Sequence, residues 1–500
     1  MDTTPDRRWH RIADALRPET RLLIDGQFRA AADGATLASI NPANGALVAE
    51  IACGSTADID AACEVAAKRF RQGVWSRMAL RQRIDVLTRF SDLIAENRDM
   101  LAVLDTMEMG KPITEMCTID VPGAVLTMRF MAESIDKIAG SAPVTNPDAL
   151  HYILRQPLGV VGCITPWNYP LMMAVWKIAP ALAAGNCVVL KPAEDTSLSA
   201  LLLGRLFLEA GGPAGVFNVV PGRGAVAGQA LARSMHVEKI AFTGSTAIGR
   251  QMYRYAADTN LKAVSAELGG KSPQIVLADV EDLSDVAEKI VDGLFGNQGE
   301  VCSAGSRILV ERTLHDEFCN LVAGHAARKY RPGDPLDPTT TMGPLVNKVH
   351  QGRVLDYIDG ARQDGAAPVL GGRSSDRTAD AACFVEPTLF AGVDNRMKIA
   401  QEEIFGPVGA IIPHDGVEDA VRIANDSPYG LAAGIWTSSL GKAHRIARDL
   451  ECGMVWINGY MNGDMSQPWG GWKLSGHGRD KCLQALIDNT QSKSVWVTLG

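Results

Sequence analysis

Cys302 stands alone among small residues, in the stretch Gly299-Glu300-Val301-Cys302-Ser303-Ala304-Gly305. Small neighbours let a reacting molecule and a backbone N–H approach the sulfur closely, and a thiolate is a strong nucleophile. A single cysteine is nevertheless more often a buried core residue. Cys302 is therefore a candidate nucleophile whose assignment depends on the groups that accompany it.

Two further residues could complete such a site. Glu267 ends a run before Leu268-Gly269-Gly270, thirty-five residues before Cys302, and a carboxylate there could act as a general base. Asn168 lies on a proline-rich turn, Thr165–Pro170, and its amide could stabilise an oxyanion. Each residue has a plainer alternative as part of a structural turn. Together, the three supply a nucleophile, a base and an oxyanion donor.

A second group of residues indicates a nucleotide site. Gly244 and Ser245 stand where a β-like run gives way to a helical one, and such a junction can present N–H groups to a pyrophosphate. The segment is not Gly-x-Gly-x-x-Gly, so this signal is weak by itself. Lys191 and Glu194 follow another apolar run. Their ammonium and carboxylate could hold ribose hydroxyls, although two such charges also suit a solvated loop.

The elements that must position these groups alternate along the chain. From residue 160 onward, apolar β-like runs are separated by helical stretches, which means parallel strands with crossover helices. We predict strands at Val160–Ile164, Cys187–Leu190, Val216–Val220 and Lys239–Phe242. We predict helices at Ile59–Phe70, Ala79–Glu96, Met172–Ala184, Leu198–Ala210 and Ala225–Ser234. The fold class is therefore doubly wound α/β. The pattern restarts at Ile275–Leu277 and Arg307–Val310, which predicts a second α/β unit.

The composition excludes several classes of protein. The 500 residues are 46% hydrophobic and 21% charged, which suits two or three packed units. A net charge of −8 without a long basic run argues against nucleic acid or an anionic membrane as a partner. Prolines and Lys177 interrupt the most apolar region, and the N-terminus lacks a secretory signal, so we expect no membrane span and a cytoplasmic protein. The ten scattered cysteines predict reduced thiols and no metal site.

Two segments fit neither α/β unit. Pro143–Arg155 suggests a hairpin arm, and the terminal run Lys493–Leu499 is β-like. Exposed strand edges usually need covering. We therefore expect these segments to pair between subunits, in a homodimer or a homotetramer.

Together, these motifs resemble those of the aldehyde dehydrogenase superfamily, over nearly the whole chain. The motifs stand in the family's order: Pro166-Trp167-Asn168, Lys191-Pro192-Ala193-Glu194, Phe242-Thr243-Gly244-Ser245-Thr246, Glu267-Leu268-Gly269-Gly270, Gly299 to Cys302, and Glu402-Glu403-Ile404-Phe405-Gly406-Pro407. Glu300 departs from the pattern, because the family often has glutamine there. The resemblance implies a Rossmann-type NAD-binding domain at 1–136 and 158–266, an α/β catalytic domain at 267–477, and a β oligomerisation arm and tail at 137–157 and 478–500.

The resemblance also implies a chemical mechanism. Cys302 would attack the carbonyl of a small-molecule aldehyde to give a thiohemiacetal, whose oxyanion Asn168 and the Cys302 backbone N–H would hold. Hydride would pass to the nicotinamide, and Glu267 would activate the water that hydrolyses the resulting thioester to a carboxylate. The expected enzyme is an NAD(P)-dependent aldehyde dehydrogenase. A catalytically silent homologue is a remote alternative, because both Cys302 and Glu267 are present.

The family pattern further implies which residues contact the cofactor. They are Glu403 and Phe405 near the nicotinamide ribose, Lys191 and Glu194 at the adenosine ribose, Gly244 and Ser245 at the pyrophosphate, and Trp167. A carboxylate at position 194 suits free ribose hydroxyls and would repel a 2′-phosphate. We therefore expect NAD, with NADP as the alternative.

The C-terminal part is most similar to γ-glutamyl-γ-aminobutyraldehyde dehydrogenases and related ω-aminoaldehyde enzymes. The residues that carry this similarity are Asn462–Gly471, Ser475–Lys481 and Asp120–Ala124. Either Asp120 or Asp464 could pair with a distant amine in the substrate, although both also suit ordinary loop acids.

The substrate pocket is expected to have an aromatic wall. Trp469 stands where the family usually has phenylalanine, and Tyr169, Trp176 and Phe295 could join it. The alternative is that these rings are simply core residues. An aromatic wall would serve a cation or an aryl aldehyde equally well. Aromatic or broad-range aliphatic aldehydes are therefore the alternative substrates.

Overall fold

The first of two large sheets has eight strands in the order β2-β1-β8-β7-β6-β9-β10-β20. The structure is a computed structural model that describes residues 7–373 and 382–499. Strands β8, β7, β6, β9 and β10 run parallel, as predicted, while β1, β2 and β20 are antiparallel additions at the edges. The strands are β1 Leu22–Ile24, β2 Gln27–Arg29, β6 Val160–Ile164, β7 Cys187–Lys191, β8 Phe217–Val219, β9 Lys239–Thr243, β10 Ala263–Glu267 and β20 Gly476–His477.

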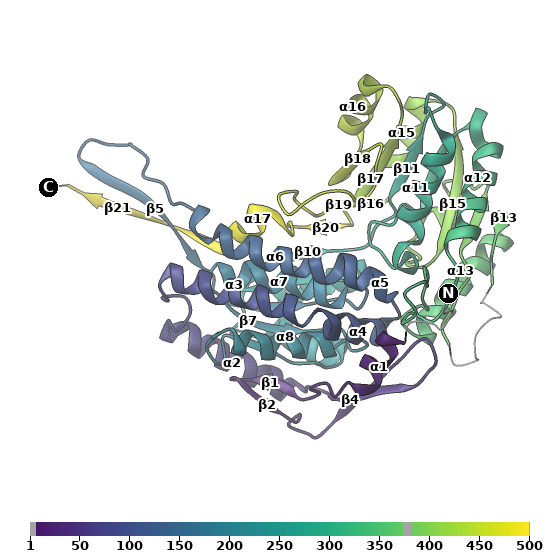
Figure 1. The fold of residues 1–500 in the computed structure, drawn as a ribbon. Coiled ribbons are helices and arrows are strands. Elements are labelled where there is room, and N and C mark those ends of the chain that lie inside the picture. Colours follow the sequence, from purple (N-terminus) through teal and green to yellow (C-terminus); the bar gives the residue numbers. More distant parts are fainter. Residues whose placement is uncertain (1–6, 374–381, 500) are drawn as a thin grey trace.

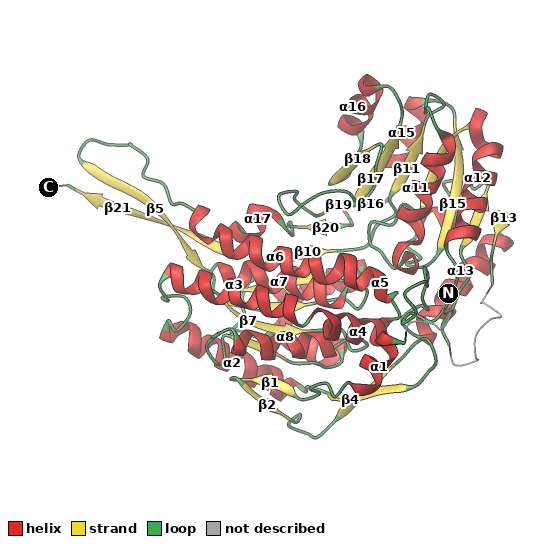
Figure 2. Ribbon diagram, in the orientation of Figure 1, coloured by secondary structure: helices red, strands yellow, loops and turns green. Residues whose placement is uncertain are grey.

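Helices cover both faces of this sheet (Figure 2). Helices α2, α9 and α10 pack on one face and α7 and α8 on the other, where α3, α4 and α6 add an outer layer. The helices are α1 Arg8–Ala15, α2 Thr56–Gln72, α3 Leu80–Glu96, α4 Arg98–Met109, α5 Ile113–Glu115, α6 Val121–Ser134, α7 Pro170–Ala183, α8 Leu198–Glu209, α9 Gln229–Arg233 and α10 Thr246–Ala257. Every residue of β6 and β7 is buried, because a parallel sheet is covered on both sides.

Local signals explain where these helices begin and end. Ser55 and Asp58 form a capping box at the start of α2, and Gly73 ends that helix in the left-handed region at φ 73°. Helix α7 begins at Pro170, two residues before the predicted start, because proline suits the first turn of a helix. The helix predicted at 225–234 is in fact a π-helical turn at Gly224–Gly228 followed by the short α9.

The parallel strands bring the predicted motifs to one edge of the sheet. Strand β6 has β7 on one side and β9 on the other, so the order of the strands reverses direction at β6. Ile164 pairs with Lys191 and Phe242, and Glu267 pairs with Thr243. The carboxyl ends of four neighbouring strands therefore share one edge, where open α/β sheets bind their ligands.

The second sheet has seven strands in the order β13-β14-β15-β12-β11-β17-β18, parallel except for β13. Its strands are β11 Pro273–Val276, β12 Arg307–Glu311, β13 Ala367–Leu370, β14 Thr388–Ala391, β15 Val408–His414, β17 Ala432–Trp436 and β18 Met454–Ile457. Its helices are α11 Leu283–Phe295, α12 His315–Lys329, α13 Lys348–Gln363, α14 Lys398–Gln401, α15 Val417–Asn425 and α16 Leu440–Asp449. Separate buried clusters lie on its two faces, so a second α/β unit is present as predicted. The residue boundaries assigned to the domains stay a prediction.

A two-stranded ribbon projects from the first unit and carries the C-terminus (Figure 1). Strand β5, Ala149–Pro157, pairs along its length with β21, Thr490–Thr498. The predicted hairpin within 143–155 is wrong, because residues 143–148 form no strand opposite β5. The segment that leads into β5 pairs with it only through an isolated bridge between Ser141 and Ile153, since Pro143 and Pro147 lack N–H donors. The arm and the tail therefore pair with each other within the chain. Pairing between subunits stays a prediction.

Smaller elements complete the fold. Two antiparallel pairs are β3 Thr36–Ile40 with β4 Leu47–Ala52 and β16 Tyr429–Gly430 with β19 Trp472–Lys473, and α17 spans Cys482–Ile487. All ten cysteines are free in the structure. In the part of the chain that the structure describes, no helix has the length and apolarity needed to cross a membrane. Over the same residues, His, Cys, Asp and Glu side chains form no group of three or more that could hold a metal ion.

Candidate active site

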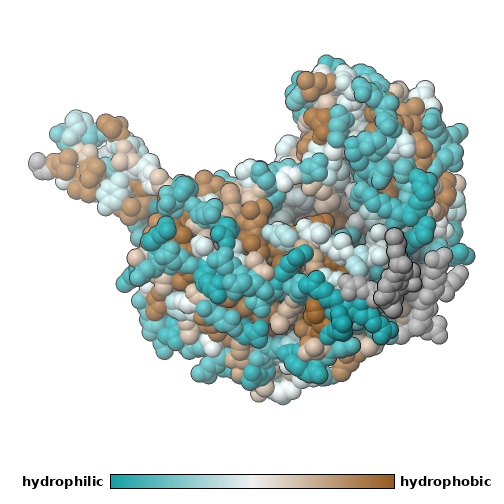
Figure 3. Space-filling view, in the orientation of Figure 1, coloured by the Kyte–Doolittle hydropathy of each residue, from teal (hydrophilic) through white to brown (hydrophobic). Residues whose placement is uncertain are grey.

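A cavity of about 550 Å³ takes its lining from both α/β units. The space-filling view shows a hollow between the two lobes of the molecule (Figure 3). Most residues predicted for the site line this cavity: Trp167, Asn168, Tyr169, Trp176, Gly244, Ser245, Glu267, Cys302, Glu403, Phe405, Asp464 and Trp469. Motifs that are far apart in the sequence therefore meet at one place.

The loop before Cys302 has an unusual backbone. After α11 ends at Phe295, Asn297 and Gln298 adopt φ angles of 48° and 56°, in the left-handed region that side-chain-bearing residues seldom occupy. Gly299 follows at φ 70°, and a Cβ there would lie 2.3 Å from the carbonyl oxygen of Gly406. Strained backbone of this kind clusters at functional sites. It supports the prediction that Cys302 is the reacting group.

The Cys302 sulfur is half-buried on the cavity wall. Burial, together with the carboxyl groups of Glu403 and Glu267, raises the pKa of this thiol to about 12. The free thiol is therefore protonated at neutral pH. Because the thiolate is the nucleophile, a site that uses this sulfur also needs a base.

The buried Asn168 amide is held beside the Cys302 loop. Its Nδ2 donates a hydrogen bond to the backbone oxygen of Glu300, 2.8 Å away. The Nδ2 of Asn297 donates in turn to the backbone oxygens of Asn168, at 2.9 Å, and Glu300, at 3.2 Å. An amide nitrogen carries two N–H groups, so Asn168 keeps one for an oxygen bound in the cavity. This geometry can provide the donor of an oxyanion hole.

Glu267 lies at the end of β10, and only 4% of its surface is exposed. Neither carboxyl oxygen finds a hydrogen-bond partner among residues 7–373 and 382–499. Burial, followed by the charge of Asp480, raises the pKa of Glu267 well above its ordinary range. A raised pKa makes a carboxylate a stronger base, which suits the removal of a proton from a thiol or from water.

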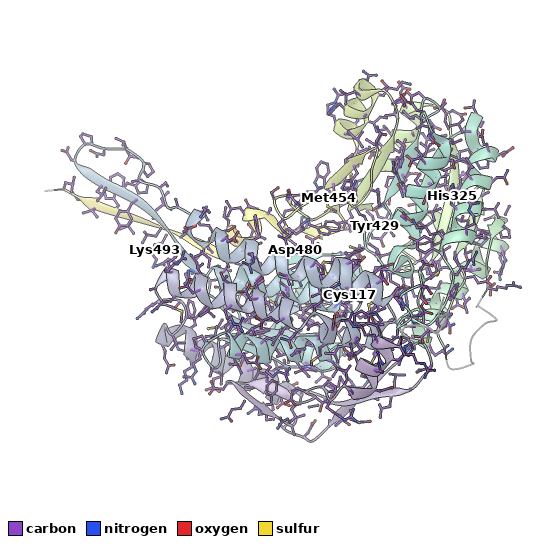
Figure 4. The ribbon with its side chains drawn as sticks, in the orientation of Figure 1. Cys117, His325, Tyr429, Met454, Asp480 and Lys493 are labelled. Atoms are coloured by element: carbon purple, nitrogen blue, oxygen red, sulfur yellow. The ribbon has the colours of Figure 1, made fainter. Side chains whose placement is uncertain are left out.

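A buried ion pair adjoins Glu267. Lys177 on α7 donates to Asp480 Oδ2 at 2.6 Å, and both side chains are almost fully buried. Figure 4 shows Asp480 near α17, over the layer that contains α6 and α7. The positive charge of Lys177 lowers the pKa of Glu267, whereas the negative charge of Asp480 raises it. Sequence reasoning missed this pair, because its members lie 303 positions apart.

Glu403 and Phe405 are fixed on the opposite wall. Glu403 Oε1 accepts a hydrogen bond from the backbone N–H of Gly270 at 3.0 Å, and burial raises the pKa of Glu403 to about 7. A Cβ at Gly269 would lie 2.2 Å from Glu403 Oε2, so only glycine leaves room for this carboxylate. His350, which sequence reasoning missed, holds the Phe405 carbonyl oxygen at 2.6 Å from Nε2.

The cavity fits a dinucleotide at the edge of the first sheet. Helix α10 begins at Thr246, and Ser245 caps it by accepting a hydrogen bond from the N–H of Ile248 at 3.4 Å. The free N–H groups of such a helix start attract phosphate. The Thr243 hydroxyl lies on the same wall, is buried and has no partner in the described part of the chain. These groups would hold a pyrophosphate, and Glu403 would hold a ribose.

Comparison with known proteins decides the family. The family model described as the aldehyde dehydrogenase family matches residues 28–495. The chain belongs to the aldehyde dehydrogenase family. The predicted fold class and enzyme class are therefore confirmed: it is an NAD(P)-dependent oxidoreductase that converts aldehydes.

Three similar aldehyde dehydrogenases illustrate the range of relatives. The NADP/NAD-dependent aldehyde dehydrogenase PuuC of Escherichia coli is 44% identical over 98% of each chain. The structure of a γ-glutamyl-γ-aminobutyraldehyde dehydrogenase from Burkholderia cenocepacia is 46% identical, with a TM-score of 0.97 over 99% of this chain and 100% of that one. An indole-3-acetaldehyde dehydrogenase solved with NAD+ gives the same identity, coverage and TM-score.

Two predicted cofactor residues of this aldehyde dehydrogenase lie outside the cavity lining. Lys191 ends β7, where burial lowers its pKa to about 8, and Glu194 Oε2 accepts a hydrogen bond from the N–H of Gly224 at 3.3 Å. They stand further along the same sheet edge, because β7 is separated from β9 by β6. That position is compatible with the far end of an extended dinucleotide. Their role in binding stays a prediction.

Two residues predicted for the substrate pocket do not line the cavity. Asp120 does not line the cavity: it is fully buried and pairs with Lys111 Nζ, 2.9 Å from each carboxyl oxygen. Asp120 lies behind the cavity wall: its partner Lys111 places an ammonium 3.4 Å from the centre of the ring of Tyr169, which lines the cavity. Phe295 is also fully buried, and its ring packs 5.7 Å from that of Tyr330 in the core of the second unit.

The predicted aromatic wall is present in part. Trp176 and Trp469 line the cavity as an edge-to-face pair with ring centroids 5.5 Å apart. Sequence reasoning missed several apolar lining residues: Ile119, Leu126, Met172, Met173, Met461 and Met465. It also missed Lys481, although the motif that contains it was recognised. Lys481 lies in an irregular segment, where no helical or strand periodicity indicates which side chains face a cavity.

Proposed function

We propose that this chain oxidises ω-aminoaldehydes or their γ-glutamyl derivatives to carboxylic acids, with NAD as the preferred cofactor. The observation that carries the proposal is the shared cavity, in which a cysteine, an amide donor and a buried glutamate meet a pocket with both charged and aromatic walls. Family membership supports the reaction class. The substrate class and the residue roles are the proposed part.

Cys302 forms the bond to the substrate. Its sulfur attacks the carbonyl carbon, and the thiol proton passes to Glu267, whose raised pKa makes it a competent acceptor. The negative oxygen of the thiohemiacetal accepts hydrogen bonds from Asn168 Nδ2 and from the Cys302 backbone N–H. NAD, when bound, accepts the hydride that this oxidation releases. Carbon and sulfur are then joined as a thioester.

Glu267 completes the reaction at a water molecule. After Glu267 has released the thiol proton to solvent, its carboxylate removes a proton as the water oxygen attacks the thioester carbon, the carbon–sulfur bond breaks, and Cys302 leaves as a thiolate with a carboxylic acid as the product. Lys177 and Asp480 adjust how strongly Glu267 holds its proton. The site therefore uses one carboxylate for both proton transfers.

The cofactor preference rests on Glu194. Its carboxylate stands at the end of the sheet edge where the adenosine ribose is expected, and it would repel a 2′-phosphate. The relative PuuC is described as NADP/NAD-dependent, so preference rather than exclusion is proposed.

The charges at the cavity mouth favour a polar substrate tail. Asp464 and Lys481 both line the cavity beside the paired indoles of Trp176 and Trp469. A plain alkyl or aryl aldehyde would leave these charges without partners. The similarity to a γ-glutamyl-γ-aminobutyraldehyde dehydrogenase over the full chain agrees with this choice.

Aryl aldehydes are the second candidate substrates. The edge-to-face indole pair and the four methionines of the cavity could accept a flat ring. The structural neighbour described as an indole-3-acetaldehyde dehydrogenase supports this alternative.

The test is NADH formation across a panel of aldehydes, each with NAD and with NADP. The panel holds γ-aminobutyraldehyde, its γ-glutamyl derivative, propanal and benzaldehyde. We expect the highest kcat/KM with an amine-derived aldehyde and NAD. A higher kcat/KM for benzaldehyde would favour the aryl alternative over the proposal. A higher kcat/KM for propanal would contradict both the proposal and the aryl alternative.

Assembly and location are also part of the proposal. The ribbon of β5 and β21 exposes Leu150 and Val497, which are direct cross-strand partners, together with Leu154 on the same face. An apolar face of this kind supports a homo-oligomer in which the ribbon packs against another subunit. A cytoplasmic location stays a prediction.

A further inference from the structure

Lys481 presents an isolated positive charge to the cavity. The residue lines the cavity, yet it is only 8% exposed. Its Nζ lies 5.7 Å from the ring centre of Trp176 and 5.8 Å from that of Trp469. Over residues 7–373 and 382–499, its ammonium has no hydrogen-bond acceptor and no carboxylate within 4.0 Å. A largely buried lysine that turns its ammonium to a cavity without an anionic partner can accept an anion supplied from outside the chain.

The backbone fixes this ammonium in place. Lys481 adopts φ 60° and ψ −160°, a combination that is almost confined to glycine, and Cys482 follows at φ 39°. On one side of Lys481, Asp480 and Trp469 exchange two backbone hydrogen bonds, at 2.8 and 2.9 Å. On the other side, the N–H of Cys482 donates to Met465 at 2.8 Å. A strained conformation held from both sides indicates that the position of the side chain matters.

Asp464 supplies a negative charge near Lys481. Its Oδ1 accepts hydrogen bonds from the backbone N–H and the hydroxyl of Ser466, while its side chain is exposed at the cavity mouth. It is too far from Lys481 to form an ion pair, although the two charges affect each other's pKa. Two opposite charges that share a cavity without touching suit a ligand that carries both signs.

We propose that Lys481 binds a carboxylate at the end of the substrate remote from the aldehyde, and that Asp464 binds an ammonium on the same end. The substrate class is therefore an aldehyde whose tail ends in an α-amino acid group. This assignment rests on the proposed function and selects the γ-glutamylated aldehydes over free ω-aminoaldehydes.

The indole pair argues against a simple cationic tail. Cations bind over the faces of indole rings, but here the ammonium of Lys481 already lies against both Trp176 and Trp469. A second ammonium at that place would meet like charge at short range. A carboxylate would instead complete the ion pair that Lys481 lacks within the chain.

Four matched aldehydes test each charge separately. They are 4-(γ-glutamylamino)butanal, with both charges; 4-(glutarylamino)butanal, with the carboxylate only; 4-(4-aminobutanoylamino)butanal, with the ammonium only; and 4-(butanoylamino)butanal, with neither. We expect the two compounds that contain the carboxylate to have a kcat/KM about 10- to 100-fold above their carboxylate-free counterparts, mainly through KM. Equal values for both members of each pair would overturn the assignment.

Substitution of Lys481 assigns this preference to one residue. In Lys481→Met, the preference for the carboxylate should fall to within about threefold, whereas Lys481→Arg should keep most of it because its charge is retained. Asp464→Asn should remove only the preference for the ammonium. Lys289→Met on the exposed face of α11 is the matched control and should change nothing. An undiminished carboxylate preference in Lys481→Met would refute the role of Lys481.

Binding without turnover separates this inference from the proposed function. Calorimetric titration of Cys302→Ala with the γ-glutamyl aldehyde needs neither cofactor nor chemistry. Loss of binding in Cys302→Ala/Lys481→Met, with binding kept in Cys302→Ala/Lys289→Met, supports the Lys481 site even if turnover fails. If the wild type oxidises propanal better than γ-aminobutyraldehyde and better than every amide aldehyde, the proposed function fails. If it oxidises the amide aldehydes but ignores the carboxylate, only the Lys481 assignment fails.

Discussion

The side-chain amide of Asn168 donates a hydrogen bond to the backbone oxygen of Glu300, 2.8 Å away, and so ties the loop after β6 to the loop that carries Cys302. The two loops belong to different α/β units. The bond fixes the direction of the remaining Asn168 N–H relative to Cys302, which lies two residues beyond Glu300. Movement between the units would therefore disturb the oxyanion hole directly.

Removal of the Asn168 amide should impair the chemical step. We expect Asn168→Ala to lower kcat about 100- to 1,000-fold, because an oxyanion donor is lost, with little change in KM. Asn297→Ala should lower kcat less, since Asn297 only positions Asn168 and the Glu300 carbonyl. Steady-state kinetics check both, with the exposed Asn44→Ala as the control. A larger effect at position 297 than at 168 would contradict these roles.

Cys302 and Glu267 should fail at different steps. Cys302→Ala should abolish aldehyde oxidation, because the proposed thiohemiacetal needs the Cys302 sulfur. Glu267→Gln should form NADH more slowly, because the thiol lacks its proton acceptor, and should stall as an acyl-enzyme after about one NADH per site, since the water lacks its base. Rapid-mixing absorbance and intact-protein mass spectrometry would detect the burst and the acyl adduct. Normal steady turnover in either variant would refute the assignment.

The ion pair beside Glu267 should set the pH dependence of thioester hydrolysis. Lys177 lowers the pKa of Glu267, so Lys177→Met should move the acid limb of the rate to higher pH. Asp480 raises that pKa, so Asp480→Asn should move the limb to lower pH. Each single variant leaves a buried charge unpaired and should lose about 3–5 kcal/mol of stability. Single-turnover hydrolysis rates from pH 5 to 9 check the signs, and shifts in the same direction would contradict the scheme.

Glu403 should make the cofactor-free protein less stable as the pH rises. Its pKa is raised from 4.5 to about 7, so its stabilising contribution is complete below pH 4.5 and is lost as the pH rises through 7. Glu403→Gln cannot ionise and escapes this loss. Its stability relative to the wild type should therefore increase between pH 4.5 and 8, by up to about 3 kcal/mol. Urea unfolding at several pH values would measure it, with Glu402→Gln as the control for the substitution itself.

The ribbon should control assembly. Leu150 and Leu154 are exposed on one face of β5, so Leu150→Glu/Leu154→Glu should place charges in any interface that this face forms. We expect a lower molar mass by light scattering, with NAD-dependent activity reduced. Ser494→Glu, on the opposite face of β21, should keep the original mass. A wild-type monomer would refute the assembly prediction.

Much of the fold was predictable because its signals are local. The strands β6 to β9 are short apolar runs, and their alternation with helices requires parallel pairing. The three proposed catalytic residues, which line one cavity, were recognisable because Cys302, Glu267 and Asn168 each belong to a motif. The ladder between β5 and β21 was not predictable, since its paired residues Pro157 and Thr490 lie 333 positions apart in the sequence.

The errors at the substrate pocket have a structural cause. A π-helical turn at Met116–Asp120 changes the number of residues per turn, so Ile119 faces the cavity while Asp120 turns toward Lys111. A periodicity of 3.6 residues cannot reveal that rotation. Phe295 is the last residue of α11. The sequence pattern predicts that its side chain is apolar and inward-facing, but does not distinguish the core of the second unit from the wall of the cavity.

Strand β20 has a consequence for how the protein is made. It pairs with β10 beside Glu267, although the ribosome makes it more than 200 residues later. Until Gly476 and His477 emerge, the edge of β10 stays open while the whole second unit is being synthesised. An open edge can recruit strands from neighbouring nascent chains. Premature stop codons before β20 should therefore yield aggregates rather than weakened enzymes, because the surroundings of Glu267 are completed only after the second unit has been made.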